Sequence, residues 1–292
     1  MTCVVGTFKM KLGWIGLGNM GSPMSQRLVK AGYPVMVYNR DKAKEEALKI
    51  MGASVASSPQ TLIEESDVII VMVTDDQAIR QIFAGNNGLL HAKATGKIII
   101  NMSTVSPGVS KDMALSCSRE GNFYLDAPVS GSVKQAEEGQ LVIMVGGSED
   151  ILEKVKPIFE HLGKLTLLVG NTGAGNKAKL AINSLLAFYA QGLAEAVVFA
   201  RKNEIKTKDL ITIINNSALR NIFTSLKADA IMQQNYKAAF ALKNIAKDLR
   251  LAKEEGLATP MGEAAFKTFQ EAEPVWGEED IIAILKHLDS LG

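Results

Sequence analysis

A glycine-rich hexapeptide near the start of the chain has the spacing of a phosphate-binding turn. It reads Gly16-Leu17-Gly18-Asn19-Met20-Gly21, and it stands between an apolar run and a helix-like segment. The first glycine of such a motif permits a tight turn, the second lets a pyrophosphate approach the backbone, and the third allows close packing of helix on strand. The N–H groups that begin the helix would then face the anion. The motif therefore predicts a dinucleotide site rather than a merely tight turn.

The residues that end the next apolar run bear on which dinucleotide is bound. Asn39 and Arg40 stand about 20 residues beyond the glycines, where an NAD site usually has an acidic residue for the ribose 2′-hydroxyl. A guanidinium group instead binds a 2′-phosphate through paired hydrogen bonds. The sequence thus favours NADP(H), with NAD(H) as the alternative. Asp41 reduces the local positive charge, and Arg40 could also be no more than a solvated residue at a helix start.

A lysine and an asparagine four residues apart could carry out proton transfer. Lys179 and Asn183 stand near the start of a long apolar segment, and a helix would place them on one face. Partial burial lowers the pKa of a lysine, which makes its ammonium group usable as a general acid and base. The alternative is a lysine that extends into solvent and has no chemical role.

Two other segments could add polar groups to this chemistry. The turn Ser130-Gly131-Ser132 follows a predicted strand, and its hydroxyl and N–H groups could hold a carboxylate. A further helical segment carries Phe240, Asn244, Lys247 and Asp248 on one stripe. Taken alone, the first pattern is that of an ordinary turn and the second that of a solvated helix face, so a functional role for either depends on the other motifs in the chain.

The elements that must position these residues alternate between strand and helix up to residue 170. Seven short runs are nearly all apolar, which is typical of parallel strands covered by helices on both faces. They are residues 11–16, 34–39, 67–73, 97–103, 122–128, 140–146 and 164–170. The alternation predicts a Rossmann-like, doubly wound α/β domain with a mostly parallel sheet over residues 11–172. We expect the last two runs to add an antiparallel edge, because less helix separates them.

Residues 173–292 are predicted to form an all-α domain for substrate binding and oligomerisation. Helical patterns there break near Asn203, Asn221 and Gly256. The first helix, about 176–202, would be ~40 Å long and is apolar on nearly every face. Its uncharged part, between Lys179 and Glu195, has 15 residues, fewer than the ~20 that span a bilayer. We therefore expect a helix wrapped by other helices, including those of a second subunit, and no membrane span.

Composition and charge argue against several other classes. The 292 residues are 47% hydrophobic and 22% charged, as in folded chains. A net charge of +1 argues against a nucleic-acid surface. Two cysteines and three scattered histidines predict neither a disulfide framework nor a metal site, and this cysteine usage fits a cytoplasmic location. The first ten residues lack the pattern of a signal peptide, and we expect them to be a short disordered extension.

Four motifs, in order and at matching spacing, resemble those of the β-hydroxyacid dehydrogenases, the family of 3-hydroxyisobutyrate and tartronate semialdehyde dehydrogenases and reductases. The motifs are GWIGLGNMGSPM, DAPVSGSVKQAEEGQL, GAGNKAKLAIN and KDLRLA, and the similarity extends from about residue 11 to 291. Within the family the chain looks closest to the NADPH-dependent glyoxylate/succinic semialdehyde reductases. In those enzymes the second strand ends in Asn-Arg, and the substrate turn reads Ser-Gly-Ser or Ser-Gly-Thr.

The resemblance implies a role for each matching residue. Lys179 corresponds to the catalytic lysine, which gives a proton to the carbonyl oxygen as hydride arrives from the nicotinamide. The turn from Ser130 through Gly131 to Ser132 corresponds to the one that holds the substrate carboxylate beside the reacting centre. Further matches are Asn183 for orienting the reacting oxygen, Asp248 for a partner near the catalytic centre, Phe240 for a pocket wall, and Val73, Thr74, Thr104 and Lys247 for cofactor contacts.

The implied activity is hydride transfer between NADP(H) and a small semialdehyde acid or its hydroxy acid, in a homodimer or homotetramer built through the helical domain. The alternatives are an NAD-dependent 3-hydroxyisobutyrate or tartronate semialdehyde enzyme and a non-catalytic NADP-binding scaffold. Two residues depart from the family pattern. Ser132 replaces the second glycine of the Ser-Gly-Gly common in isobutyrate-type members, and Gln135 stands where relatives often have Gly or Pro. Lys179 argues against the imine reductases, which share the fold but usually replace this lysine.

Overall fold

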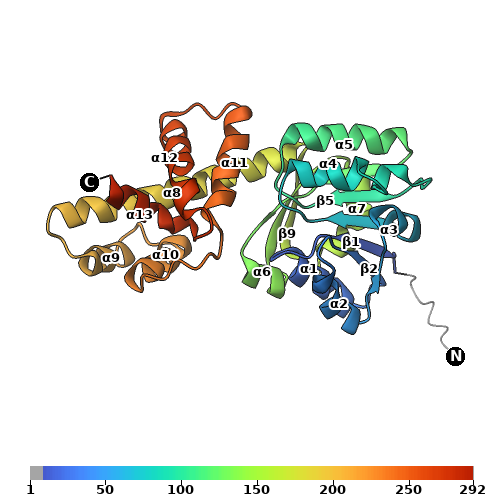
Figure 1. Cartoon of the computed structure of the whole chain (residues 1–292), viewed down its shortest axis with the longest axis horizontal. Coiled ribbons are helices and arrows are strands. Elements are labelled where there is room, and N and C mark those ends of the chain that lie inside the picture. Colours follow the sequence, from blue (N-terminus) through green and yellow to red (C-terminus); the bar gives the residue numbers. More distant parts are fainter. Residues whose placement is uncertain (1–8, 292) are drawn as a thin grey trace. The chain divides into compact units, whose positions relative to one another are not determined.

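The computed structural model describes residues 9–291, and its N-terminal part is built on a single sheet (Figure 1). The strands are β1 (Leu12–Ile15), β2 (Val35–Tyr38), β3 (Ser54–Val55), β4 (Val68–Val71), β5 (Ile98–Asn101), β6 (Phe123–Asp126), β7 (Val129–Ser130), β8 (Leu141–Gly146) and β9 (Gly163–Gly170). They are ordered β3-β2-β1-β4-β5-β6-β8-β7, with β9 paired to β8. The strands from β3 to β6 are parallel. The strand order reverses beside β1, and ligands of open α/β sheets bind at such a point.

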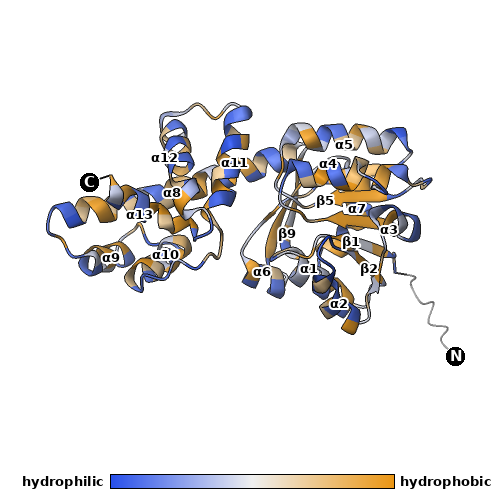
Figure 2. Cartoon of the chain, viewed as in Figure 1, coloured by the Kyte–Doolittle hydropathy of each residue, from blue (hydrophilic) through white to orange (hydrophobic). Residues whose placement is uncertain are grey.

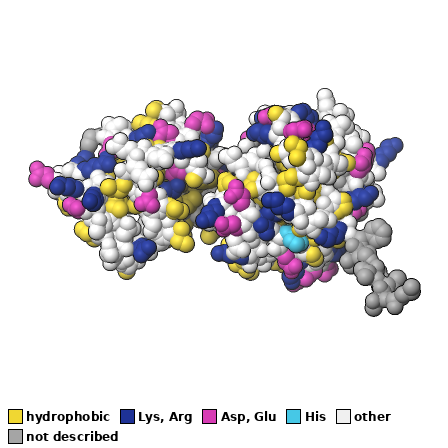
Figure 3. Space-filling view, turned by 90° about the horizontal axis from the view of Figure 1, so that it is seen from below, with side chains coloured by type: hydrophobic (Ala, Val, Ile, Leu, Met, Phe, Trp, Pro, Cys, Tyr) yellow, Lys and Arg dark blue, Asp and Glu magenta, His cyan; other side chains and the backbone are white. Residues whose placement is uncertain are grey.

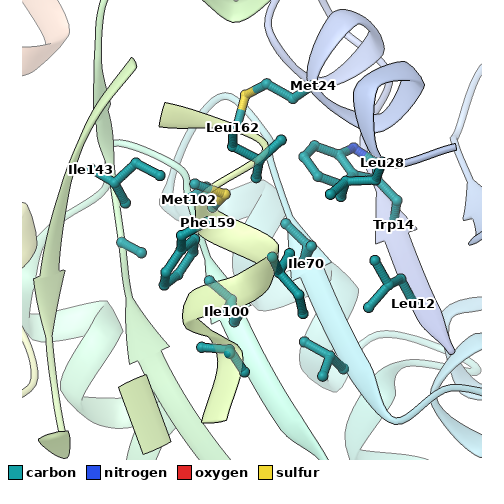
Figure 4. Packing of buried hydrophobic residues seen from close by; sticks show 14 of the residues in the cluster. Leu12, Trp14, Met24, Leu28, Ile70, Ile100, Met102, Ile143, Phe159 and Leu162 are labelled. Carbon is teal, nitrogen blue, oxygen red and sulfur yellow. The ribbon is translucent and has the colours of Figure 1, made fainter. Parts of the chain in front are cut away.

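Helices cover both faces of the sheet. They are α1 (Gly21–Lys30), α2 (Glu46–Ile50), α3 (Pro59–Glu65), α4 (Asp76–Ala84), α5 (Pro107–Arg119), α6 (Val133–Glu138) and α7 (Glu149–Phe159), with short 3₁₀ turns at Lys42–Glu45 and Leu89–His91. Successive strand residues belong to opposite faces. Trp14 packs in a cluster with Leu28 of α1 and Phe159 of α7 (Figure 4), and Ile15 belongs to the cluster of α3, α4 and α5 on the other face. The predicted doubly wound, mostly parallel α/β domain is confirmed.

The seven apolar runs are all strands, with ends within two residues of those predicted. The sequence missed β3 and β7, which have two residues each and are too short to show a pattern. β8 runs antiparallel to β6 and β7, and β9 is parallel to β8. The last two runs therefore lie antiparallel to the main sheet, as expected. The expectation that little helix separates them is wrong. An 11-residue helix, α7, separates them and returns the chain so that they pair in parallel.

Residues after β9 form helices. They are α8 (Ala174–Lys202), α9 (Thr207–Asn215), α10 (Ile222–Met232), α11 (Leu242–Glu254), α12 (Pro260–Trp276), a 3₁₀ turn (Ile281–Ala283) and α13 (Ile284–Ser290). The predicted breaks are confirmed: α8 ends before Asn203, Asn221 caps α10 by accepting from the Thr224 N–H, and Gly256, with φ of 98°, follows α11. In the described part of this region the only strand-like pairing is an isolated bridge between Ala241 and Asp280. The all-α prediction is confirmed.

The chain divides into two compact units, and the division falls inside α8, between Lys179 and Leu180. Within the helical unit, α8 packs its alanine-rich face on the core, where Ala187, Ala190 and Ala194 are fully buried. The opposite face exposes large apolar side chains, among them Leu185 at 47% and Tyr189 at 45%. The helices of its own unit thus cover only one side of α8, and the expectation that a second subunit covers the rest stays a prediction.

By length and composition alone, α8 would qualify as a membrane span, with 39% of its most apolar window buried. One face of α8 belongs to the apolar core of the helical unit, which Figure 2 shows coloured by hydropathy. Cys3, like most of the extension expected to be disordered, lies outside the described residues.

One guanidinium group joins three elements of the sheet unit. Arg27 of α1 donates through Nε to the His161 carbonyl (2.6 Å) and through Nη1 to the Glu137 carbonyl (2.8 Å). Gly139, which ends α6 with φ of 69°, lies against this group, because a Cβ there would be 2.5 Å from the guanidinium and would displace it. Arg27 thus fixes the end of α6 and the loop before β9 to α1.

We expect Arg27→Ala to lower the free energy of unfolding by about 2 kcal/mol, because two charge-assisted hydrogen bonds to backbone carbonyls are lost. Urea unfolding followed by circular dichroism measures the change. The matched control is Arg80→Ala, which breaks an ion pair with Asp112 whose side chains are both more than half exposed; it should cost less than about 1 kcal/mol. Equal shifts for the two variants would contradict the assigned role.

Candidate active site

The glycine-rich turn connects β1 to α1 at the carboxyl edge of the sheet. Gly16 has a φ of 98°, and a Cβ there would lie 2.1 Å from the Met72 carbonyl oxygen. A Cβ on Gly21 would lie 2.0 Å from the Gly16 carbonyl oxygen. Packing therefore requires glycine at both positions. A Cβ on Gly18, by contrast, would meet nothing within 4 Å, so this glycine is explained by a ligand that approaches the backbone.

The start of α1 fits the phosphates of a dinucleotide. No side chain caps this helix end, and its first turn contains no acidic residue. The N–H groups of the turn and the positive end of the helix dipole are thus suited to an anion. Together with the open space at Gly18, this arrangement fits a nucleotide cofactor at the β1–α1 turn.

Asn39 at the end of β2 supports the glycine-rich turn. Its Oδ1 accepts from the Leu17 N–H (2.9 Å), and its own backbone N–H donates to the Glu45 carboxylate (2.7 Å). Glu45 is buried and also pairs with Lys42 at 2.9 Å. Sequence reasoning missed Glu45, since nothing in the pattern shows that a residue six positions past Asn39 folds back onto it. Arg40 extends from this corner and is exposed.

The loops after β4 and β5 are joined beside the glycine-rich turn. The Val73 N–H donates to the Ser103 hydroxyl (2.9 Å), and the Ser103 N–H donates to Asn101 Oδ1 (3.0 Å). Thr74 donates its hydroxyl to Asp75, which caps α4. Thr104 follows Ser103 directly, so Val73, Thr74 and Thr104, the cofactor contacts implied by the resemblance, all lie in these adjoining loops. Ser103 is fully buried, and its hydroxyl holds the loop after β4 in place.

The first turn of α8 is anchored to the same edge of the sheet. Asp126, the last residue of β6, accepts from the N–H groups of Gly173 (2.7 Å) and Asn176 (2.9 Å). Burial raises the pKa of the Asp126 carboxyl, and hydrogen bonds from these N–H groups oppose that rise. The Asn176 side chain accepts from the Val105 N–H at 3.0 Å. Lys179 therefore stands one helical turn beyond an anchor on the loop that carries Thr104.

The turn predicted to hold a carboxylate follows β7. Ser130 pairs with Val142 of β8, and Gly131 has a φ of 144°. Gln135 directs its Oε1 to Ser132 and accepts from both the backbone N–H (2.8 Å) and the hydroxyl. This is a capping box for α6. Both donors of Ser132 are thus directed to Gln135, and a carboxylate held at Ser132 would replace this amide oxygen.

In the helical unit, α8 and α11 bring three of the predicted site residues together. Asn183 donates through Nδ2 to Asp248 Oδ2 at 2.5 Å, and both residues are at least 97% buried. Lys247 lies 3.1 Å from the other oxygen, Oδ1, although that pair does not have the geometry of a hydrogen bond. Asp248 therefore fixes the orientation of the Asn183 amide on the face of α8 that also carries Lys179.

Phe240 precedes α11 and is held by Asp280. The Asp280 carboxylate accepts from the N–H groups of Ala239 (3.0 Å) and Phe240 (3.3 Å) and from the Lys227 ammonium (2.6 Å). Its side chain is 3% exposed. The sequence did not identify this clamp, because Asp280 stands 40 residues from Phe240 in a stretch without a recognisable motif.

Comparison with protein families covers nearly all of the described chain. Residues 11–171 match the model of the NAD binding domain of 6-phosphogluconate dehydrogenase. Residues 173–288 match the model described as the NAD-binding region of NADP-dependent 3-hydroxyisobutyrate dehydrogenase. The two matches correspond to the sheet-based region and to the helices that follow it.

Individual relatives support the same assignment. Glyoxylate/succinic semialdehyde reductase 2 of Arabidopsis thaliana is 32% identical over 96% of this chain and 79% of its own length. The 2-(hydroxymethyl)glutarate dehydrogenase of Eubacterium barkeri is 36% identical over 95% of this chain and 94% of its own. Among solved structures, a Mycobacterium tuberculosis 3-hydroxyisobutyrate dehydrogenase with L-serine covers 96% of this chain and 99% of its own, with a TM-score of 0.87 and 27% identity. The chain therefore belongs to the β-hydroxyacid dehydrogenase family and is an NAD(P)-dependent oxidoreductase.

Proposed function

We propose that the enzyme interconverts a small semialdehyde acid, of the glyoxylate or succinic semialdehyde type, and its hydroxy acid with NADP(H). The observation that carries this proposal is the anchoring of α8 by Asn176 to the loop after β5. It puts Lys179 one helical turn from the edge of the sheet where the cofactor-binding loops converge. The names of the two relatives described above, one a semialdehyde reductase and the other a hydroxy-acid dehydrogenase, support the same substrate class.

The cofactor, when bound, supplies a hydride to the carbonyl carbon of the substrate. The turn from Ser130 to Ser132 holds the substrate carboxylate and so fixes the carbonyl group. As the carbonyl π bond breaks, Lys179 passes a proton from Nζ to the oxygen, and its neutral amine regains a proton from solvent. Asn183, whose amide is held by Asp248, is assigned to the same oxygen by the resemblance. In the oxidative direction Lys179 acts as the general base.

The preference for NADP(H) rests on the corner at the end of β2. A carboxylate that could bind a ribose 2′-hydroxyl is present there, but Glu45 is buried and bonded to the Asn39 N–H and Lys42. Lys42 also packs over the Tyr38 ring, 4.2 Å from its centroid. Arg40 is the exposed cation next to Asn39 and the better partner for a 2′-phosphate. An NAD-dependent 3-hydroxyisobutyrate or tartronate semialdehyde enzyme is the alternative.

Replacement of the lysine tests the proton-transfer role. Lys179→Ala should lower kcat for semialdehyde reduction by about 10²-fold or more, the scale of general acid catalysis. The dissociation constant for NADPH, measured by fluorescence titration, should stay unchanged. The control is Lys177→Ala, an exposed lysine two residues away on α8, which should leave kcat intact. Wild-type turnover in the Lys179 variant would refute the role, whereas a lack of turnover in the unmodified protein would favour the scaffold interpretation.

Replacement of the arginine tests the cofactor preference. Arg40→Asp should shift the ratio of kcat/KM for NADPH over NADH towards NADH by roughly tenfold to a hundredfold, because paired charge-assisted hydrogen bonds to the 2′-phosphate are lost. Lys44→Asp makes the same charge change at an exposed position nearby and serves as the control. If both variants shift the ratio equally, general electrostatics rather than a specific contact explains it.

We also propose that the enzyme forms oligomers through its helical unit. Ile222 and Leu226 of α10 are 81% and 62% exposed, one turn apart. The ring of the neighbouring Phe223 lies 6.2 Å from that of Tyr189, so this surface continues onto the exposed face of α8. Apolar side chains on the surface of the helical unit are visible in Figure 3. A second copy of the chain is the proposed occupant, since such a large apolar surface is costly in water.

A charge placed on this surface should dissociate the oligomer. We expect Ile222→Glu to yield a smaller particle by sedimentation velocity at micromolar concentration. Ile50→Glu is the matched control, because Ile50 of α2 is 79% exposed and lies in the other unit. A monomeric wild-type protein, or identical sedimentation of the two variants, would contradict the proposal.

A further inference from the structure

Asp126 stands at the point where two functional segments meet. Its backbone ends β6, four residues before Ser130, and its fully buried carboxylate lies against the first turn of α8. Oδ1 accepts from the Gly173 N–H at 2.7 Å, and Oδ2 accepts from the Asn176 N–H at 2.9 Å. One side chain thus links the strand that leads into the substrate turn to the helix that carries Lys179.

Asn176 extends this connection to two more segments. Its side chain is fully buried, accepts from the Val105 N–H at 3.0 Å and donates to the Ser110 hydroxyl of α5 at 3.1 Å. Its own N–H is bound by Asp126. A rotation of α8 about its axis, or a shift along it, would break these bonds together. The start of α8 is therefore fixed in both directions.

The packing around the carboxylate leaves no room for adjustment. A Cβ on Gly146 would lie 2.5 Å from Asp126 Oδ1, and a Cβ on Gly175 would lie 2.9 Å from Oδ2 and 2.7 Å from the Asp126 carbonyl oxygen. Two neighbouring elements thus approach Asp126 at glycines from either side. This close fit holds the carboxylate at a single position relative to β8 and α8.

We propose that Asp126 and Asn176 are positioning residues that set the place of Lys179 Nζ relative to the carboxylate held at the Ser130 turn. The proposal rests on the proposed function of Lys179. Asn176 and Lys179 are three residues apart and lie on one face of α8. Because a displacement of about 1 Å at a reacting group can cost roughly 10²-fold in rate, loss of this anchor acts on kcat. Neither residue touches the glycine-rich turn, so binding of the cofactor phosphates at that turn is unaffected.

The test compares two buried asparagines of the same unit. Asn176→Ala removes the anchor, whereas Asn122→Ala removes a side chain that also makes two hydrogen bonds, with the Lys97 N–H and the Ala94 carbonyl, at the amino end of β6. Both should lower the unfolding midpoint to a similar extent. Only Asn176→Ala should lower kcat, by roughly tenfold to a hundredfold, and this loss should be much larger than any change in KM for NADPH. With NADPH deuterated at the transferred position, the isotope effect on kcat should be larger for Asn176→Ala than for the wild-type enzyme. A misplaced proton donor makes the chemical step slower than product release.

Lys179→Ala, measured in parallel, separates this proposal from the one on which it rests. If Lys179→Ala loses activity while Asn176→Ala keeps the kcat and isotope effect of Asn122→Ala, the positioning role is overturned and the role of Lys179 stands. If Lys179→Ala keeps wild-type turnover, the proton-transfer assignment itself falls. Should Asn176→Ala fail to fold, Asp126→Asn is assayed in the same way; it keeps the volume but leaves one backbone N–H without an acceptor.

Discussion

The contact on which the site most depends is a buried carboxylate held by the backbone of a helix start. Asp126 has no solvent around it, so its charge is supported by the N–H groups of the first turn of α8. A carboxylate at this end of a helix also faces the favourable pole of the helix dipole. The hydrogen bonds that stabilise the buried charge therefore also fix the start of α8. They fix the position of Lys179 as well, because it lies one turn further along this helix.

In the glycine-rich turn, packing explains two of the glycines and ligand binding explains the third. Gly16 and Gly21 are explained by neighbouring backbone atoms, whereas the space beside Gly18 is open. The Leu17 N–H is held by Asn39, which is held in turn by the buried Glu45. A polar chain from the end of β2 thus fixes the turn between β1 and α1. It also occupies the carboxylate of Glu45 near the end of β2.

The sequence alone predicted those features of the fold that follow from local burial or local backbone conformation. It predicted the strands of the sheet, the helical region and the breaks at Asn203, Asn221 and Gly256, because apolar periodicity and glycine conformation are local properties. It grouped Lys179 with Asn183 through helix spacing alone. The supports of the site were not predictable in this way. Glu45 and Asp280 act through contacts that only the folded chain creates, and the pairing of Asn183 with Asp248 spans 65 residues. β3 and β7 are too short for any periodicity.

The capping box at the start of α6 has a consequence for the unliganded enzyme. The amide oxygen of Gln135 already satisfies the donors of Ser132, much as a bound carboxylate oxygen would. The turn thus contains an internal mimic of its proposed ligand, and adventitious anions gain less by binding there than they would at bare N–H and hydroxyl groups. A substrate acid that binds at this turn, as proposed, would have to displace this side chain, so its affinity would report a difference between two acceptors rather than the strength of one.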